Sequence, residues 1–319
     1  MKMVLNTTQP NAAASMFYMG AFSGIDRMDF QKNNYQDYDI ALFMTYDHHA
    51  IKGVREKYPH LKIGIIDPRN YKVFESTKYC DFIIIDSIEM EDFWRASNKP
   101  IFKYIEYPNI PYISKKHKTK DIITIGYHGN QIHLKCMSQN VTPALNLLAK
   151  KYNLELLVMG GGPPLSESAP WYPENMAVRH VPWSMDNYLN ELGKCDIGIV
   201  PNNLIHNDTL PPDPQNFNYS LDDYSLRFKM PSNPGRLAVF GILNIPVVAD
   251  FYPSAIQYLQ GDNGFIAHSV AGWHHCLEQL ISSSELRQQT ADNLQNLIKN
   301  KFNFEYQNKK LVSFLETMI

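Results

Sequence analysis

The sequence predicts an α/β protein with two Rossmann-like domains, each built on a parallel sheet, that face a cleft. Apolar segments of four to six residues alternate along the chain with amphipathic or polar segments of helical length. The alternation stops once, in a stretch rich in Pro and Lys, and then restarts. With 319 residues the chain is also longer than one ordinary core requires. Strands that are apolar throughout and separated by helices are typical of parallel sheets buried on both faces.

The first domain is predicted to cover residues 1–118. Its strands are expected at residues 2–7, 39–44, 61–66, 81–85 and 101–105, and its helices at 12–19, 50–57, 71–79 and 91–96. In residues 108–120 Pro and charge accumulate while hydrophobic periodicity disappears, so we expect a linker. Its basic residues 115–118 are predicted to be solvated, with a weak contact to anionic lipid headgroups as the alternative.

The second domain is predicted to cover residues 119–303. Its strands are expected at residues 122–126, 154–159, 176–181, 196–200, 246–249 and 264–267. Its helices are expected at residues 141–151, 185–192, 234–243, 254–259, 271–281 and 284–300. A last helix, within residues 304–319, is expected to pack back on the first domain. Because ligands of open parallel sheets bind beyond the carboxyl ends of the strands, both domains could contribute to one site.

Composition narrows the function classes. The apolar fraction of 44% and the charged fraction of 19% are typical of a globular protein with a substantial core. A net charge of −2 argues against general nucleic-acid binding, which normally requires a dominant basic face. The sequence has no apolar run long enough to span a bilayer and no secretory signal pattern, so we expect a cytoplasmic protein, with peripheral contact at the inner membrane face as an alternative.

No metal or cofactor is expected. The four cysteines form no Cys-x-x-Cys pair and are predicted to be reduced core thiols. Asp37, Tyr38 and Asp39 match an Asp-x-Asp pattern that can hold a divalent metal, but the pattern stands before its strand rather than after it. Asp39 is therefore interpreted as a strand-entry residue.

Residues 227–236 predict an anion site. They place Lys229, Ser232, Asn233 and Arg236 at the start of the helix expected at residues 234–243. A helix N-terminus presents unpaired N–H groups and the positive end of the helix dipole, and cationic side chains add charge-assisted bonds. The alternative is an ordinary capped helix start with basic residues nearby by chance.

Two glycine-containing loops follow predicted strands of the second domain. In residues 125–130, Gly126 and Gly129 would let a ligand approach the backbone closely. The loop matches neither Gly-x-Gly-x-x-Gly nor a Walker loop, which weakens dehydrogenase and kinase interpretations. In residues 160–162, Gly161 is a candidate cleft residue, although a flexible turn before two prolines is the preferred explanation of this loop.

The order of these motifs resembles the donor-binding half of GT-B glycosyltransferases, in the group around glycosyltransferase family 4. The resemblance rests on Ile-Gly-Tyr-His-Gly-Asn at 125–130, Gly-Gly-Gly at 160–162, Val-Pro-Trp at 181–183 and Cys-Asp-Ile-Gly-Ile-Val-Pro at 195–201, followed by Lys229, residues 232–236, Ile-Pro-Val-Val at 245–248, Asp-Asn-Gly-Phe at 262–265 and Trp273. It covers about residues 120–300; the shorter amino-terminal half resembles the acceptor domain only in outline.

The resemblance implies transfer of a sugar from a nucleoside-diphosphate sugar to a hydroxyl acceptor, with retention and without a metal. It places the donor phosphates against Gly129 and Asn130, with His128 and Lys135 as further candidates, and it makes His128 a candidate catalytic residue beside Lys229 and Arg236. The diphosphate would also be bound by Lys229 and Arg236, with Ser232 and Asn233 beside them. Preorganised cations and helix N–H groups would stabilise the charge of the departing diphosphate.

The sequence departs from family 4 at one pair of positions. These enzymes usually carry two glutamates eight positions apart around this helix, and here Pro231 and Val239 stand in their places. Neither side chain accepts a hydrogen bond, so we interpret the chain as a divergent member with altered donor contacts; loss of activity is the alternative.

Acceptor and base candidates come from the expected strand ends of the first domain. They are Thr8 and Gln9, His48 beside Asp47, Asp67, and Asp86. A carboxylate there could act as a base if the reaction inverts the anomeric centre. Each residue has the alternative role of capping the next helix.

Residues 202–227 are predicted to form a cover over the donor, because loops of that length are either functional or disordered. Two other functions remain open: a nucleotide-sugar epimerase, and a non-catalytic module that binds nucleotide sugars. The sequence leaves the base and the sugar open, and glycan, lipid-linked and small-molecule acceptors all fit.

Overall fold

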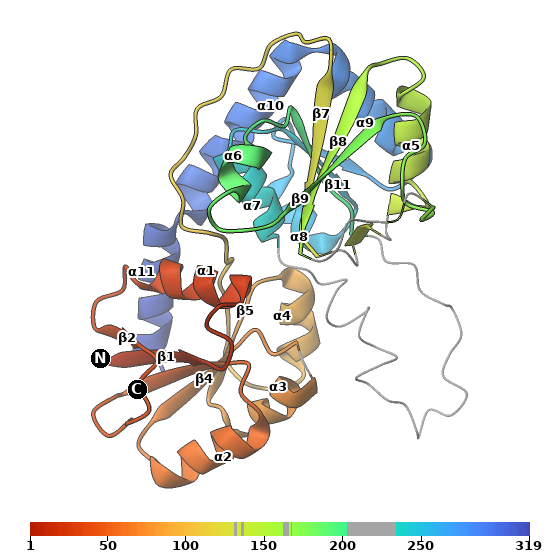
Figure 1. The fold of residues 1–319 in the computed structure, drawn as a ribbon. Coiled ribbons are helices and arrows are strands. Elements are labelled where there is room, and N and C mark those ends of the chain that lie inside the picture. Colours follow the sequence, from red (N-terminus) through yellow and green to blue (C-terminus); the bar gives the residue numbers. More distant parts are fainter. Residues whose placement is uncertain (70, 131–132, 135–136, 162–165, 167, 203–233) are drawn as a thin grey trace. The chain divides into compact units, whose positions relative to one another are not determined.

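The computed structural model describes the chain except residues 70, 131–132, 135–136, 162–165, 167 and 203–233. The described residues form two compact units (Figure 1). The first unit consists mainly of Met1–Asn109 and Lys301–Ile319. The second unit consists mainly of residues 110–202 and Arg236–Asn300. Each unit contains one six-stranded sheet in which all strand pairs are parallel.

The first sheet has the strand order β2-β1-β3-β4-β5-β6. Its strands are β1 (Met3–Thr7), β2 (Met28–Phe30), β3 (Ile40–Met44), β4 (Lys62–Ile66), β5 (Phe82–Ile85) and β6 (Ile101–Lys103). Strand β2 was not predicted, because its three residues are only half-buried at the sheet edge and form no apolar run. The other strands lie within one or two residues of the predicted ranges.

Helices cover both faces of the first sheet. They are α1 (Ala13–Phe22) and α11 (Phe304–Glu316) on one face, and α2 (His48–Lys57), α3 (Tyr71–Ser76) and α4 (Ile88–Arg95) on the other. The alternation of side chains along a strand divides the core accordingly: Leu5 packs with residues of α1 and α11, and its neighbour Val4 packs with residues of α2, α3 and α4.

Helix α11 is attached to the first unit by buried side-chain amides as well as by apolar packing. Asn308 accepts a hydrogen bond from the Tyr104 hydroxyl at 2.8 Å and donates one to the Ala21 carbonyl at 2.9 Å. Gln307 accepts from the Ile105 N–H at 2.8 Å. The carboxyl-terminal helix is therefore part of the core of the unit that the amino terminus begins.

The second sheet has the order β12-β11-β10-β7-β8-β9. Its strands are β7 (Ile123–His128), β8 (Leu154–Gly160), β9 (Ala177–Pro182), β10 (Ile197–Val200), β11 (Val247–Asp250) and β12 (Phe265–Ala267). The first strand lies in the middle, and the chain order runs outward in both directions from it. Neighbouring strands β7 and β10 therefore form a topological switch point of the Rossmann type.

The helices of the second unit include α5 (Val141–Leu148) and α9 (Val270–Ser282), which cover one face of the sheet. Helix α7 (Gly235–Ile242) packs on the opposite face through Phe240, whose ring lies directly over Gly198 of β10. The remaining helices are α6 (Tyr188–Leu192), α8 (Pro253–Tyr258) and α10 (Ser284–Leu297), which a π-helical turn, Ile298–Phe302, extends. Within the described residues, no helix combines the length and the apolar character needed to cross a membrane.

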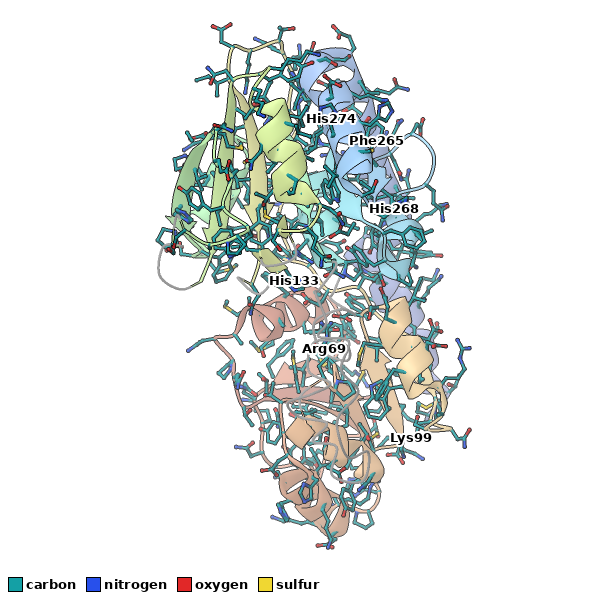
Figure 2. The ribbon with its side chains drawn as sticks, turned by 90° about the vertical axis from the view of Figure 1, so that its right-hand side faces the viewer. Arg69, Lys99, His133, Phe265, His268 and His274 are labelled. Carbon is teal, nitrogen blue, oxygen red and sulfur yellow. The ribbon has the colours of Figure 1, made fainter. Side chains whose placement is uncertain are left out.

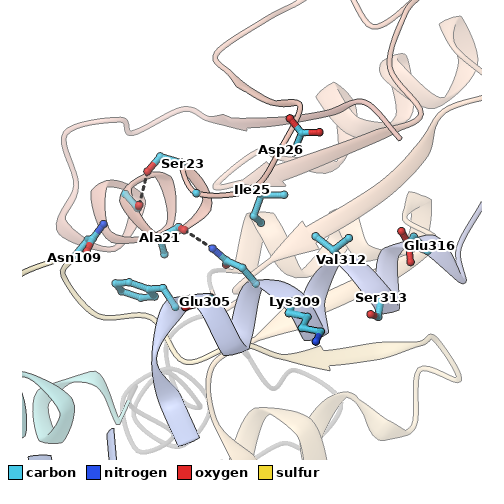
Figure 3. Close-up of a pocket in the computed structure, with 14 residues that line it drawn as sticks. Ala21, Ser23, Ile25, Asp26, Asn109, Glu305, Lys309, Val312, Ser313 and Glu316 are labelled. Carbon is cyan, nitrogen blue, oxygen red and sulfur yellow. Dashed lines mark hydrogen bonds between the residues drawn. The ribbon is translucent and has the colours of Figure 1, made fainter. Parts of the chain in front are cut away.

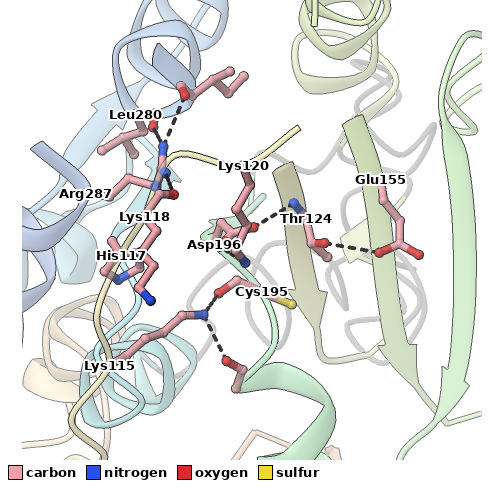
Figure 4. A network of polar contacts seen from close by, with 12 residues as sticks. Lys115, His117, Lys118, Lys120, Thr124, Glu155, Cys195, Asp196, Leu280 and Arg287 are labelled. Carbon is pink, nitrogen blue, oxygen red and sulfur yellow. Dashed lines mark hydrogen bonds and ion pairs between the residues drawn. The ribbon is translucent and has the colours of Figure 1, made fainter. Parts of the chain in front are cut away.

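The basic segment before β7 is bonded to the second unit (Figure 4). Lys115 Nζ donates to the carbonyls of Gly193, at 2.9 Å, and of Cys195. Lys120 Nζ pairs with the buried Asp196 carboxylate at 2.6 Å. Burial lowers the pKa of Lys115. The prediction of a solvated linker is therefore wrong for Lys115. It is also wrong for His117, which is buried and whose Nε2 lies 2.9 Å from the Asn244 carbonyl. The contact with lipid headgroups stays a prediction.

Candidate functional site

The carboxyl edge of the second sheet brings several predicted residues together at the switch point. Strand β7 ends at His128 and continues into Gly129, and the neighbouring β10 continues into Pro201 and Asn202. Arg236, the second residue of α7, reaches both strand ends. In open parallel sheets this position is where phosphate-bearing ligands bind, because loops from both sides leave room beyond the strands.

Arg236 is held by acceptors that follow β10. Its Nη1 donates to the Pro201 carbonyl at 3.2 Å and its Nη2 to Asn202 Oδ1 at 3.0 Å. The guanidinium is planar and always charged, so two bonds to fixed acceptors set its orientation. A half-buried, oriented cation in the first turn of a helix is suited to bind an anion.

Gly129 lets Arg236 take this position. Its φ of +137° belongs to a backbone conformation that residues with a Cβ rarely adopt, and a Cβ there would lie 3.1 Å from Arg236 Cδ. The Gly129 N–H donates to the Met159 carbonyl at 3.1 Å, so it is used within the sheet edge. The exposed Asn130 accepts at its carbonyl from the Tyr127 hydroxyl at 2.6 Å.

His128 lies beneath α7 with its side chain buried. Its ring packs edge-on against Phe240, with the centroids 4.9 Å apart, and its Nε2 lies 3.3 Å from the Arg236 carbonyl. Burial, aided by the positive charge of Arg236, lowers the pKa of His128 to about 4. The imidazole is thus neutral near pH 7, and the carbonyl partner assigns the proton to Nε2, which donates.

Asp250 and Asn202 join this site although the sequence did not single them out. Asp250 ends β11 and is buried; its Oδ2 accepts from the Asn202 N–H at 2.6 Å and its Oδ1 from Trp273 Nε1 at 3.0 Å. The available signal was a carboxylate directly after an apolar strand. Sequence reasoning passed over it because the partner N–H groups lie 23 and 48 positions away.

Several predicted donor residues lie outside the described part of the chain: Lys135, Lys229, Ser232 and Asn233, together with Pro231 and most of the predicted cover. Gly161 is described; it is exposed just after β8, and a Cβ there would meet nothing within 4 Å. Val239, at the position of the later family 4 glutamate, is 3% exposed within α7. Its buried position suits an apolar side chain.

In the first unit, hydroxyl groups meet at the ends of the adjacent strands β1 and β3. The Thr8 and Thr45 hydroxyls lie 2.6 Å apart, and the Thr7 hydroxyl lies 3.2 Å from that of Thr45. Gln9 donates its N–H to the Thr7 hydroxyl at 3.1 Å. The order of this sheet reverses between β1 and β3, so Thr8 and Gln9 lie at its switch point.

Asp67 and Asp86 share one arginine. Arg69, labelled in Figure 2, pairs with both carboxylates through separate nitrogens. Asp86 is fully buried, whereas the Asp67 side chain is 12% exposed and has a φ of +50°, in the left-handed region. The negative charge of Asp67 also acts on Tyr18: burial is the main cause that raises the pKa of Tyr18, and the Asp67 charge is the second. A base must reach an acceptor hydroxyl, and only Asp67 of this pair is open to one.

The other candidates of the first unit have local partners. Asp47 caps α2 by accepting from the Ala50 N–H at 2.9 Å, and the half-buried His48 follows it as the first residue of the helix. Asp39 precedes β3 and accepts from the Lys2 N–H at 2.6 Å. The structure thus places Asp39 at strand entry, as predicted. Within the described residues there is no group of three or more His, Cys, Asp or Glu placed to hold a metal ion.

The first unit also contains a hollow of about 620 Å³ between α1 and α11 (Figure 3). Asn308, which bridges the two helices, is among the residues that line it. Charged groups of both signs surround it, including Asp26, Lys309 and Glu316. No predicted site residue contributes to this hollow.

The chain matches known proteins in structure. No protein-family model and no curated protein matches the sequence. Sucrose-phosphate synthase from Thermosynechococcus elongatus aligns with a TM-score of 0.69 at 9% identity, over 100% of this chain and 99% of that one. Anabaena Alr3699/HepE, solved in complex with UDP, aligns with a TM-score of 0.64 at 12% identity, over 99% of this chain and 100% of that one.

The fold is GT-B. A glycosyltransferase from Rickettsia africae shares it, with a TM-score of 0.62 at 10% identity over 99% of this chain and 98% of that one. The GT-B fold confirms the predicted architecture of two parallel sheets flanked by helices. Membership of family 4 within the GT-B enzymes stays a prediction.

Proposed function

We propose that the chain is a glycosyltransferase that moves a sugar from a nucleoside-diphosphate sugar to an acceptor hydroxyl. One observation carries the proposal: Arg236 is oriented in the first turn of α7, at the switch point of the second sheet. The GT-B fold supports it, because the similar chains include glycosyltransferases and one was solved with UDP. Fold alone does not determine activity, so the site carries the argument.

Arg236 is assigned to the donor diphosphate. When the sugar leaves, negative charge develops on the diphosphate, and a fixed guanidinium with helix N–H groups stabilises that charge without reorganisation. Lys229 is proposed as a second cation, with Gly129, Asn130, Lys135, Gly161, Ser232 and Asn233 as further donor contacts. His128 was predicted to be catalytic; as a neutral imidazole that donates to the Arg236 carbonyl, it is proposed to support the helix start.

The reaction is proposed to retain the anomeric configuration and to need no metal. The diphosphate charge is assigned to cations of the chain, and retention requires no protein base. At the acceptor side we propose the strand ends of the first unit, with Thr8, Gln9, His48 and Asp67 as candidates. Asp86, which is fully buried, is proposed to act only through its ion pair with Arg69. A glycan, a lipid-linked sugar or a small molecule could supply the hydroxyl.

The test is a thermal-shift panel of UDP-, GDP-, ADP- and CMP-sugars, followed by a transfer assay with the sugar that stabilises the protein. A ligand present at about 100 times its Kd should raise the free energy of unfolding by about 2.7 kcal/mol. Interconversion of the sugar without an acceptor would instead identify an epimerase. A shift without any turnover would identify a binding module, and no shift with any member would contradict the proposal.

Replacing Lys229 and Arg236 together with Ala should abolish both the thermal shift and transfer. Arg179→Ala is the matched control, because Arg179 lies in the same unit but pairs with Glu155 and Glu191. Persistence of both binding and transfer in the double variant would rule out this site. Product NMR reports the anomeric configuration, and activity that requires manganese would contradict the metal-independent mechanism.

A further inference from the structure

A chain of hydrogen bonds runs from helix α9 to Arg236. Trp273 Nε1 donates to Asp250 Oδ1 at 3.0 Å, and the Asn202 N–H donates to Asp250 Oδ2 at 2.6 Å. The side chain of the same Asn202 accepts from Arg236 Nη2 at 3.0 Å. Four residues from α9, β11, the β10 end and α7 are thus linked in series.

We propose that Asp250 is a positioning residue, which holds Asn202 so that Arg236 meets a nucleoside diphosphate in a fixed orientation. This inference rests on the proposed function, because it assumes that Arg236 binds the diphosphate. Asp250 is assigned to act through its hydrogen bond with Asn202 and not on the reacting atoms.

Burial makes this arrangement rigid. Trp273 is fully buried, Asn202 is 1% exposed and Asp250 is 2% exposed, so water has little access to these bonds. The Asp250 carboxylate accepts one N–H on each oxygen, which fixes it from two directions. Arg236 in turn has a second fixed acceptor, the Pro201 carbonyl at 3.2 Å, which comes from the same strand end as Asn202. A shift of residues 201–202 would therefore move these two acceptors of the guanidinium together.

The chain requires a carboxylate at position 250. Two N–H groups point at this side chain, and a carboxylate offers an acceptor oxygen to each. Asparagine has nearly the same shape but only one acceptor oxygen, so its NH₂ group would face one of the two donors. A buried donor left without an acceptor is costly, so Asp250→Asn should weaken the hydrogen bond that holds the Asn202 N–H.

The experiment compares the wild type with Asp250→Asn by calorimetric titration with UDP, uridine and inorganic pyrophosphate. Loss of orientation at Arg236 should weaken UDP and pyrophosphate binding about tenfold, in line with the strength of one hydrogen bond to a charged group. Uridine carries no phosphate, so its affinity should stay unchanged. Adding Asp250→Asn to Arg236→Ala should then cause no further loss of UDP affinity, because the two residues act in one chain.

Asp196→Asn is the matched control. Asp196 is a buried carboxylate directly before β10, and it accepts from the Thr124 N–H at 3.1 Å at the other edge of the sheet. Its loss should lower stability without changing UDP affinity. If Asp250→Asn does not fold, Asn202→Ala removes the link to Arg236 while keeping the backbone N–H on Asp250, and the same selective loss is expected.

The outcomes separate this inference from the proposed function. Equal UDP affinity of Asp250→Asn and the wild type, or an equal loss for UDP and uridine, would overturn the positioning role and leave the donor site intact. A wild-type protein that binds neither UDP, another nucleoside diphosphate nor pyrophosphate would overturn the donor site, and the positioning role with it.

Discussion

His128 illustrates how one buried side chain links the site to stability. Its ring packs between the end of β7 and Phe240 of α7, and its Nε2 reaches the carbonyl of Arg236. Charging this ring would place a second positive charge beside Arg236 in a site with little water. The same burial that fixes the helix start therefore keeps the imidazole neutral.

The pH dependence of unfolding tests this placement. The folded pKa of His128, about 4, lies below the ordinary value of 6.5, so between these values the unfolded chain binds more protons. Stability contributed by the neutral ring is complete above pH 6.5 and is lost as the pH falls towards 4. From pH 7 to pH 5 we expect this group to cost about 2 kcal/mol of unfolding free energy.

The measurement is denaturant unfolding of the wild type and of His128→Gln at pH 7 and pH 5. Gln keeps an N–H donor but does not titrate. The unfolding free energy that His128→Gln loses between pH 7 and pH 5 should therefore be about 2 kcal/mol smaller than the loss in the wild type. His117 and His180, whose pKa values burial also lowers, are present in both proteins and cancel in the comparison. If both proteins lose the same unfolding free energy, the His128 ring must be charged in the folded protein without cost, as it would be in solvent.

Among the elements, α7 and its two supporting strands decide the geometry of the site. The Phe240 ring lies over Gly198 of β10, where a Cβ would come within 2.6 Å of the ring. The same ring lies 3.6 Å from the position of a Cβ on Gly126 of β7. A Cβ on Gly126 would thus be in ordinary contact with the ring, whereas one on Gly198 would clash with it. Gly198 is therefore the strand glycine that lets the helix approach the sheet, which brings Arg236 to the strand ends.

Gly198→Ala should push α7 away from the sheet. Overpacking of a core typically costs about 1–3 kcal/mol, and the displaced helix start should also weaken UDP binding. Thermal denaturation and UDP titration measure the two effects. Phe240→Leu in the Gly198→Ala background should restore part of both, because a smaller side chain makes room for the methyl group.

Gly53→Ala serves as the control for this variant. Gly53 lies within α2, and a Cβ there would meet nothing within 4 Å, so alanine should be neutral or stabilising by up to about 1 kcal/mol. If Gly198→Ala is tolerated as well as Gly53→Ala, then contact with Gly198 does not determine the position of α7.

Elements were predictable from sequence where a periodic apolar signal existed. The strands β1 and β3–β6 of the first sheet and β7, β8 and β10–β12 of the second came from apolar runs, whereas the short edge strand β2 has none. Lys115 was misread because the carbonyls that bind it, Gly193 and Cys195, are distant in sequence. The same reason hid Asp250: its role depends on tertiary partners, while Gly129 and Arg236 belong to local loop and helix-start patterns.

At the scale of the whole molecule, the restart of the apolar alternation predicted two sheets, and the structure contains two sheets with different strand orders. The strand order of the first sheet reverses direction between β1 and β3, and that of the second sheet between β7 and β10. Each unit therefore has its own switch point. The apolar alternation alone does not say which sheet the last helix packs on. That helix was expected to pack back on the first domain, and long-range contacts group it with that unit.

Asn308 provides a test of that connectivity. Its side chain joins three distant segments, since it donates to the Ala21 carbonyl and accepts from the Tyr104 hydroxyl. Asn308→Ala would leave both groups buried without this partner, at a cost of about 1–3 kcal/mol for each. Hydrogen exchange should then quicken in α1, β6 and α11 and stay unchanged in β7–β12, while the thermal shift with UDP persists.

The control for Asn308→Ala lies on the same helix. Lys310 is exposed and its Nζ lies 4.4 Å from the centre of the Tyr306 ring, so Lys310→Ala should leave exchange in both units nearly unchanged. Faster exchange throughout β7–β12 in Asn308→Ala would show that the two units unfold as one cooperative body. Unchanged exchange in α1 and β6 would show instead that apolar packing by Leu311 and Leu315 attaches α11 without the amide.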